Sequence, residues 1–200
     1  MRIIGGRFKG TRLAAPGAKG GGKAHLRPTS DRVRESLFNL LTHGDYPDIE
    51  GARVLDLFAG TGALGFEALS RGAARVVFID DGPAARGLIR QNIETLNATG
   101  QTKLWRRNAT TLGQCQGDPY DLVFADPPYG KGLGLAALAS ARAGGWIAPG
   151  AIVVLEETAE GAIEAPEGLL EMDNRTYGDT RILIFRDVLA GGLGVPDDND

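Results

Sequence analysis

The sequence predicts an α/β fold whose sheet is mostly parallel and closes with an antiparallel hairpin. From Arg53 onward, short apolar runs alternate with stretches of helical length, which is typical of βαβ units. Near the C-terminus, two strand-like runs flank Gly178-Asp179-Thr180 and indicate a hairpin instead. With 200 residues, the chain is long enough for one such domain and a small addition, but hardly for two full domains.

The amino-acid composition excludes several classes of protein. The hydrophobic content of 42% and the charged content of 24% are typical of a soluble globular chain. No apolar run approaches the roughly 20 residues of a membrane-spanning helix, and the N-terminus lacks a secretory signal. We therefore expect a cytoplasmic protein without membrane contact. A single cysteine, Cys115, and two histidines exclude an intrachain disulfide and argue against a metal site.

Charge is distributed unevenly along the chain. Residues 1–36 hold nine Lys and Arg against two acidic residues, whereas the remainder holds 13 against 23. A basic arm on an acidic body is expected of a protein that binds a polyanion with one end, although a merely solvated extension is the alternative. We expect a basic N-terminal extension over residues 1–45, a main domain over 46–187, and a tail over 188–200 that is disordered.

The extension itself divides into three parts. Residues 1–13 alternate weakly and predict a short hairpin or an extended arm, and Gly17–Gly22 predicts a loop that could order on a partner. A helix is expected from about Ser30 to Thr42, with Ser30 as N-cap. Its apolar face comprises Val33, Leu37, Leu40 and Leu41, and its other face is expected to display Arg32 and Arg34 beside Arg27.

The main domain follows in regular alternation. Strands are expected over residues 53–58, 75–80, 103–106, 121–125 and 151–155, and the hairpin strands over Leu169–Tyr177 and Arg181–Phe185. Helices are expected from the glycine turn to Arg71, over Pro83–Asn97 and over Leu133–Ala143.

A glycine-rich loop joins the first strand to its helix. Gly60-Thr61-Gly62-Ala63-Leu64-Gly65 fits the pattern G-x-G-x-x-G, and Asp80 lies twenty residues beyond Gly60, at the end of the second strand. Glycines let the backbone approach a ligand, and a carboxylate at that position can accept hydrogen bonds from two ribose hydroxyls. The pattern predicts a nucleoside cofactor site.

The acidic residue Asp56 indicates which nucleoside cofactor the glycine-rich loop can bind. A dinucleotide would place its pyrophosphate over this turn, where a carboxylate opposes it. S-adenosylmethionine instead carries an ammonium and a sulfonium, so Asp56, Asp80 and Asp126 could line one cationic nucleoside. Asn108-Ala109 follows the short third strand and is expected at the adenine edge, although Asn108 could equally be a turn residue.

The tetrapeptide Asp126-Pro127-Pro128-Tyr129 follows a buried strand and is therefore expected at the carboxyl edge of the sheet. Its parts suit a planar exocyclic amine: Tyr129 can stack on a base, while Asp126 and the carbonyl of Pro127 can accept hydrogen bonds from the amine. Because a neutral thioether leaves, positioning can supply much of the rate without a metal. A rigid turn without a function is the alternative.

Together these residues resemble the class I S-adenosylmethionine-dependent methyltransferases and, more narrowly, the bacterial 16S ribosomal RNA guanine-N2 methyltransferases of the RsmD-like family. The resemblance covers Arg2 to Arg186. It rests on the segments Arg2–Gly6, Arg27–Asn39, Asp56–Gly65 and Asp126–Tyr129. The stretch R-P-T-x-D-R-V-R-E within Arg27–Asn39 is specific to that family, whereas the last two segments occur in many methyltransferases.

The resemblance implies a Rossmann-like, seven-stranded methyltransferase domain over residues 46–187. It also implies methylation of the guanine 2-amino group in 16S ribosomal RNA, on an assembled or nearly assembled 30S subunit, with S-adenosylmethionine as cofactor. Asp80 stands where relatives often have glutamate, so Asp81 could share or take its role. We also expect a monomer.

The expected site residues fall into three groups. Those for catalysis are Asp126, Pro127 and Tyr129. Those for the cofactor are Asp56, Ala59, Gly60, Gly62, Ala63, Asp80, Asp81, Asn108, Ala109 and Asp126. Those for RNA phosphates are Arg2, Arg7, Lys9, Arg12, Arg27, Arg32 and Arg34, although Arg27 or Thr29 could instead reach the methionine carboxylate.

Three other functions compete with this one. A nicotinamide oxidoreductase would share the glycine loop, but Asp56 disfavours it and it has no use for the tetrapeptide. A DNA methyltransferase for adenine N6 or cytosine N4 would need a target-recognition domain, for which 200 residues leave little room. A non-catalytic ribosome-assembly protein would have no reason to keep both motifs intact.

Overall fold

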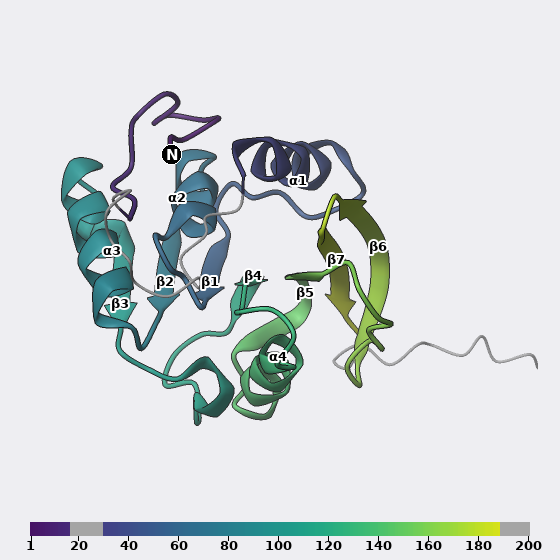
Figure 1. The fold of residues 1–200 in the computed structure, drawn as a ribbon. Helices are drawn as coiled ribbons and strands as arrows, with labels where there is room; N and C mark the ends of the chain where they lie inside the picture. Colours follow the sequence, from purple (N-terminus) through teal and green to yellow (C-terminus); the bar gives the residue numbers. More distant parts are fainter. Residues whose placement is uncertain (17–29, 189–200) are drawn as a thin grey trace, which may run out of the picture.

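A seven-stranded sheet organises the computed structural model, which describes residues 1–16 and 30–188 (Figure 1). The strand order is β3-β2-β1-β4-β5-β7-β6. The strands are β1 Arg53–Leu57, β2 Arg75–Ile79, β3 Thr102–Trp105, β4 Tyr120–Ala125, β5 Ile147–Thr158, β6 Leu169–Tyr177 and β7 Thr180–Asp187. The first five are parallel, whereas β7 pairs antiparallel with both β5 and β6. The mostly parallel sheet with a C-terminal hairpin is confirmed.

Four α-helices cover the two faces of the sheet. They are α1 Asp31–His43, α2 Ala63–Ser70, α3 Pro83–Thr95 and α4 Leu133–Ala143. The first three lie on one face and α4 lies on the other (Figure 1). In the described ranges, no helix is both long and apolar enough to cross a membrane.

Alternation along the strands builds two hydrophobic cores. Val54, Val76 and Phe124 belong to the core under α1, α2 and α3, whereas their neighbours Leu55 and Val77 belong to the core under α4. Helix α1 begins as expected, because the side chain of Ser30 accepts a hydrogen bond from the backbone N–H of Val33.

The topology fixes where a ligand can bind. From β1 the chain runs outward through β2 and β3, then returns to β4 on the other side of β1. Leu57 and Ala125, which end β1 and β4, are register partners. The loops after these two strands therefore lie side by side at the switch point of the sheet, where open α/β folds bind their ligands.

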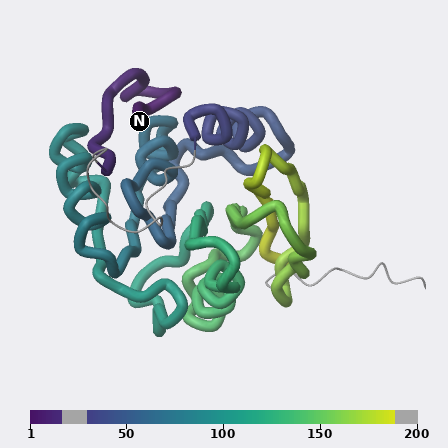
Figure 2. Tube along the Cα trace, in the orientation of Figure 1, coloured from purple at the N-terminus to yellow at the C-terminus, as the bar shows by residue number. Residues whose placement is uncertain are grey.

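Residues 1–13 form the short hairpin, one of the two predicted conformations. Arg2 bridges antiparallel to Arg12, and the N–H of Ile3 donates to the carbonyl of Thr11 at 3.0 Å. Ile3 and Leu13 are buried in the core beneath α1 and α2, and Figure 2 shows the hairpin beside α2. The predicted loop Gly17–Gly22, together with Arg27, Thr29 and all but the first residue of the predicted tail, lies outside the described residues.

The buried carboxylate of Glu67 on α2 holds this hairpin. It accepts the backbone N–H groups of Ile4 and Gly5 at 2.9 and 2.8 Å and the Nε–H of Arg71 at 3.1 Å. The Nε of Arg34, which is also buried, lies 3.9 Å from it. Two backbone donors and two guanidinium groups thus surround one desolvated charge.

We expect Glu67→Ala to lower the free energy of unfolding by about 3–5 kcal/mol, because it takes a buried counter-charge from Arg34 and Arg71 and the acceptor from the N–H groups of Ile4 and Gly5. Hydrogen exchange at Ile4 and Gly5 should accelerate in the same variant. Urea unfolding measures the first effect. Glu94→Ala, on the exposed face of α3, is the control and should stay within about 0.5 kcal/mol of the wild type. Equal losses of stability in both variants would contradict the anchoring role.

Candidate functional site

The loop after β1 has a backbone that favours glycine. Gly60 and Gly62 have positive φ angles of 56° and 78°. A Cβ added at Gly62 would lie 2.5 Å from the ring of Phe66, so both the dihedral angle and the space require glycine there. Phe58, which begins the loop, also has a positive φ of 56°. A non-glycine residue in this region is strained, and such strain clusters at ligand-binding sites.

Asp56 lies beneath this loop and is almost fully buried, with 2% of its surface exposed. Its Oδ2 accepts the N–H of Gly65 at 3.0 Å, which joins β1 to the first turn of α2. Burial, together with the nearby charge of Asp80, raises the pKa of Asp56 to about 8. A cation placed against Asp56 would favour its charged form.

Asp80 holds the loop from the neighbouring strand. Its Oδ2 accepts the N–H of Gly60 at 2.9 Å and its Oδ1 accepts the N–H of Gly82 at 2.8 Å. Burial raises its pKa despite these two hydrogen bonds. Asp81 is exposed and its carbonyl accepts from Arg86. The structure therefore brings Asp80, and not Asp81, to the glycine loop.

Asn108 and Ala109 follow β3 as expected. The Oδ1 of Asn108 accepts the N–H and the hydroxyl of Thr110 at 2.9 and 2.8 Å, which caps a short 3-10 helix over Ala109–Thr111. The turn role that the sequence left open for Asn108 is confirmed. Contact of Asn108 and Ala109 with adenine stays a prediction.

The tetrapeptide turns away from the sheet directly after β4. The N–H of Asp126 donates to the carbonyl of Leu57 at 3.4 Å, so the tetrapeptide contacts the end of β1, from which the glycine loop departs. Pro127 is buried, and Asp126 is half-buried. Tyr129 is 41% exposed, and its hydroxyl donates to Oε1 of Glu156 at 2.5 Å. A tyrosine ring at the surface beside a half-buried carboxylate can meet a flat aromatic ligand.

Two carboxylates of this site were not identified from the sequence. Glu156 and Glu157 directly precede Thr158, the last residue of β5, at the same edge of the sheet and are 5% and 9% exposed. Glu157 accepts the N–H of Gly130 at 3.1 Å, so each glutamate holds one residue of the turn after Pro128. A sequence pattern could have identified them, because two acidic residues directly follow the apolar run 151–155. The carboxyl end of that run adjoins the carboxyl end of β4.

The hydroxyl of Tyr129 remains protonated. Burial raises its pKa, the hydrogen bond to Glu156 raises it further, and the charges of Glu156 and Asp126 act in the same direction. Tyr129 is thus a hydrogen-bond donor that faces two carboxylates.

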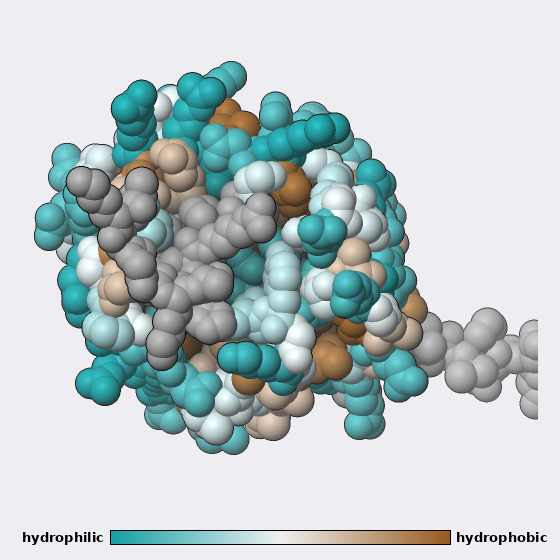
Figure 3. Space-filling model, in the orientation of Figure 1, coloured by the Kyte–Doolittle hydropathy of each residue, from teal (hydrophilic) through white to brown (hydrophobic). Residues whose placement is uncertain are grey.

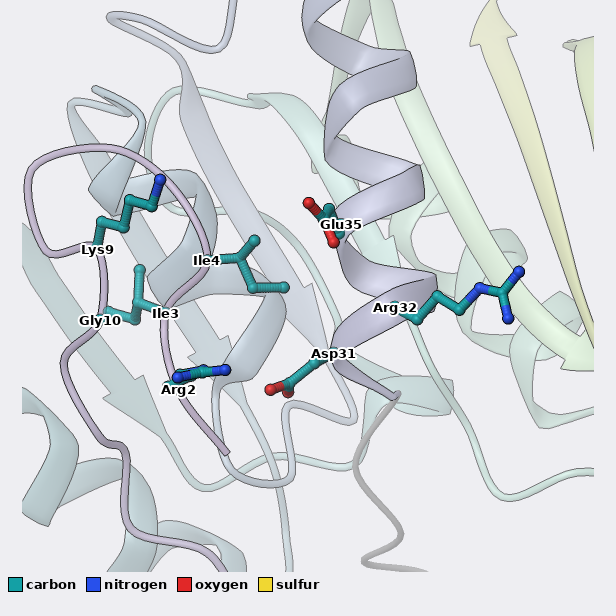
Figure 4. A pocket seen from close by; sticks show the side chains of 8 residues that line it. All are labelled: Arg2, Ile3, Ile4, Lys9, Gly10, Asp31, Arg32 and Glu35. Atoms are coloured by element: carbon teal, nitrogen blue, oxygen red, sulfur yellow. The ribbon is translucent and has the colours of Figure 1, made fainter.

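The basic residues of the hairpin and α1 lie around a groove of about 460 Å³ (Figure 4). Arg2, Lys9, Arg32 and the acidic Asp31 and Glu35 line it, with Ile3, Ile4 and Gly10. Arg7 and Arg12 are exposed on the same hairpin. Figure 3 shows a largely hydrophilic surface over the hairpin and α1.

The expectation that Arg34 lies on the exposed face of the helix is wrong. Only 1% of Arg34 is exposed, and its guanidinium donates to the carbonyl of Arg2 and to Asp31. The physical reason is helical periodicity: position 34 precedes the buried positions 37, 38 and 41 on one stripe of α1. Arg34 is part of the protein interior and joins α1 to the hairpin and, through Glu67, to α2.

Comparison with known proteins gives consistent results. The family model described as "Conserved hypothetical protein 95" matches residues 1–186. "Ribosomal RNA small subunit methyltransferase D" of Escherichia coli is 40% identical over 163 residues, which cover 82% of this chain and 77% of that protein. Its namesake of Haemophilus influenzae is 34% identical and covers 89% of each chain. The solved structure "Putative methyltransferase yhhF from Escherichia coli" matches with a TM-score of 0.80 and 35% identity, over 94% of this chain and 98% of that chain.

We expect Asp56→Asn to stabilise the ligand-free protein at pH 8 more than at pH 5. The folded protein holds the proton of Asp56 up to about pH 8, whereas the unfolded chain releases it near the ordinary value of 3.8. The stability of the wild type therefore falls as the pH rises between these values, and the variant does not show that decrease. Thermal unfolding measures the difference, at about 2–4 °C for each kcal/mol.

Asp48→Asn is the control for this experiment, because its carboxylate is exposed on a loop. Its midpoint should follow that of the wild type at both pH values. A loss of stability in Asp56→Asn that is equal at pH 5 and pH 8 would show that the carboxylate of Asp56 is not held protonated.

Proposed function

Because the chain belongs to the RsmD-like family of bacterial small-subunit ribosomal RNA methyltransferases, we propose that it transfers a methyl group from S-adenosylmethionine to the 2-amino group of a guanine in 16S ribosomal RNA. The observation that carries the proposal is the convergence of two loops at the switch point: the acid-lined glycine loop after β1 and the tetrapeptide after β4. The substrate is the assembled 30S subunit, which the protein meets in the cytoplasm.

The residues of the glycine loop fit S-adenosylmethionine. When bound, this cofactor supplies a methyl group on a sulfonium, which leaves as a neutral thioether. Asp56 is a buried carboxylate whose charged form an ammonium would stabilise. Asp80 would hold the ribose hydroxyls, and Gly60, Gly62 and Ala59 would let the backbone approach the cofactor. A pyrophosphate would gain no such stabilisation from these acidic residues, which argues against a nicotinamide dinucleotide.

The tetrapeptide would hold the target amine. Asp126 and the carbonyl of Pro127 accept its two hydrogens, which favours a pyramidal nitrogen and directs its lone pair at the methyl carbon. The ring of Tyr129 stacks on the base. The amine would give up one proton in the transfer, and Asp126 or water would receive it. A paired guanine must first leave its stack to reach this position.

The groove between the hairpin and α1 would bind the RNA backbone. Arg2, Lys9 and Arg32 line it, and Arg7 and Arg12 extend the positive surface along the hairpin. Arginine and lysine side chains that bind phosphates displace condensed counterions, so the affinity depends on salt. Arg34 takes no part in this interaction because it is buried.

We expect Asp126→Ala to abolish methyl transfer while it leaves the affinity for S-adenosylmethionine within about tenfold, or roughly 1.4 kcal/mol. The assay transfers labelled methyl to 30S subunits that lack the modification, with naked 16S ribosomal RNA alongside, and identifies the product nucleoside. Calorimetry measures the affinity. N2-methylguanosine on subunits is the expected product. Methylated adenosine or cytidine, or product on duplex DNA alone, would contradict the guanine assignment.

We expect the double variant Arg2→Ala, Arg32→Ala to bind 30S subunits more weakly. The logarithm of its binding constant should also fall less steeply with the logarithm of the salt concentration, by roughly one unit of slope for each phosphate that the variant no longer binds. Lys103→Ala is the control, since Lys103 is exposed and its register partner Val77 belongs to the core under α4, on the other face of the sheet. Filter binding over a series of salt concentrations gives both quantities. If the double variant keeps the slope of the control, the groove is not the RNA surface.

A further inference from the structure

Glu156 lies next to the tetrapeptide although it is thirty residues away from Asp126 in sequence. Ala125 and Leu155 are register partners on the parallel strands β4 and β5, so Asp126, the first residue after β4, lies beside Glu156, which continues β5 and pairs with Ile182 of β7. Glu156 is 5% exposed and accepts the hydroxyl of Tyr129. The hydrogen bond from Tyr129 and the register of β4 and β5 thus place the carboxylate of Glu156 at the tetrapeptide.

The bases that carry an exocyclic amine differ in the ring atom beside it. In guanine the 2-amino group adjoins N1–H, which is a donor. In adenine and cytosine the amino group adjoins a ring nitrogen without hydrogen, which is an acceptor. The guanine amine also adjoins N3, which is an acceptor, so the side matters. A carboxylate on the N1 side of the amine suits guanine alone, because on the corresponding side of adenine or cytosine it would face a ring nitrogen lone pair.

We propose that Glu156 selects guanine by accepting its N1–H, while Asp126 and the carbonyl of Pro127 accept the amine. The inference rests on the proposed function and names the group that determines its specificity. In the ligand-free structure the hydroxyl of Tyr129 is the donor to Glu156. The incoming N1–H replaces this hydroxyl, and the tyrosine, whose side chain is 41% exposed, turns to stack on the base.

Burial makes this selection strong. At 5% exposure a hydrogen bond to the carboxylate is little weakened by water, so a base without N1–H forgoes a strong charged hydrogen bond. Sites built to hydrogen-bond a substrate N–H or O–H reject the analogue that lacks it by factors of about 10⁴.

Glu157 provides a matched comparison. It is the next residue on β5 and is similarly buried, but its Oε1 accepts the backbone N–H groups of Gly130 and Thr158 at 3.1 and 2.9 Å. Its carboxylate fixes the turn. An amide oxygen could still accept both bonds, so Glu157→Gln should leave the choice of base unchanged.

The test uses 2-aminopurine, which keeps the 2-amino group of guanine but lacks N1–H. Subunits are reconstituted with 16S ribosomal RNA that carries guanine or 2-aminopurine at the position the wild type methylates, and kcat/KM is measured for each. The wild type should prefer guanine by at least about a hundredfold. In Glu156→Gln the amide can donate to N1 of 2-aminopurine, so this preference should shrink at least about tenfold.

Three control variants separate selection from folding. Glu157→Gln and Tyr129→Phe should keep the wild-type preference, although Tyr129→Phe removes the same hydrogen bond to Glu156. Glu156→Asp retains the carboxylate and should restore much of the preference that Glu156→Gln loses. Because 2-aminopurine also lacks O6, only the change between variants reports on N1–H.

Two results would overturn the inference in different ways. If Glu156→Gln and Glu156→Asp lower both rates by the same factor and leave the ratio unchanged, Glu156 only positions Tyr129, and the proposed function stands. If the wild type methylates no guanine in any subunit, the proposed function fails and the role of Glu156 fails with it.

Discussion

The buried carboxylate of Glu67 is the group on which the arrangement of this protein depends. It lies on α2, the helix that begins in the glycine loop, and it accepts two backbone N–H groups of the N-terminal hairpin. The hairpin forms one side of the groove that Arg2, Lys9 and Arg32 line. One desolvated charge thus joins the segment that would bind RNA to the element that would bind the cofactor, and Arg34 and Arg71 balance it.

Asn92 on α3 makes a second connection of the same kind. Its Oδ1 accepts the N–H of Ala14 at 2.6 Å, and its Nδ2 donates to the carbonyl of Thr61 at 3.0 Å. Thr61 lies inside the glycine loop and Ala14 directly after the hairpin. Because Asn92 is fully buried, its polar atoms need both partners. A displacement of the hairpin would therefore disturb the hydrogen bond between Asn92 and the glycine loop.

Local sequence patterns predicted most of the scaffold. The cap at Ser30, the alternation of strands and helices, and the glycine loop all depend on neighbours within a few residues, and the structure has each of them. Strand β5 begins at Ile147, before the predicted Ala151, because Tyr120 pairs with Ile147 ahead of a shift in register.

The prediction failed where a side chain finds its partner far along the chain. Arg34 was assigned to the surface because arginine is usually exposed, yet besides the nearby Asp31 its partners are Glu67 and the carbonyl of Arg2. No local pattern identifies Glu67 as that partner. The spacing of 34, 37, 38 and 41 did place the arginine on the buried stripe, so periodicity was the better guide than residue type.

The folded protein places its acidic and basic residues on different surfaces. Asp56, Asp80, Asp126, Glu156 and Glu157 all end strands there or directly follow them, whereas the exposed basic residues of the hairpin and α1 surround the groove. A polyanion is attracted to the second surface and repelled by the first. In the proposed reaction this difference orients the substrate, because phosphates bind at the groove and only a group that donates hydrogen bonds, such as the edge of a guanine, is stabilised among the carboxylates.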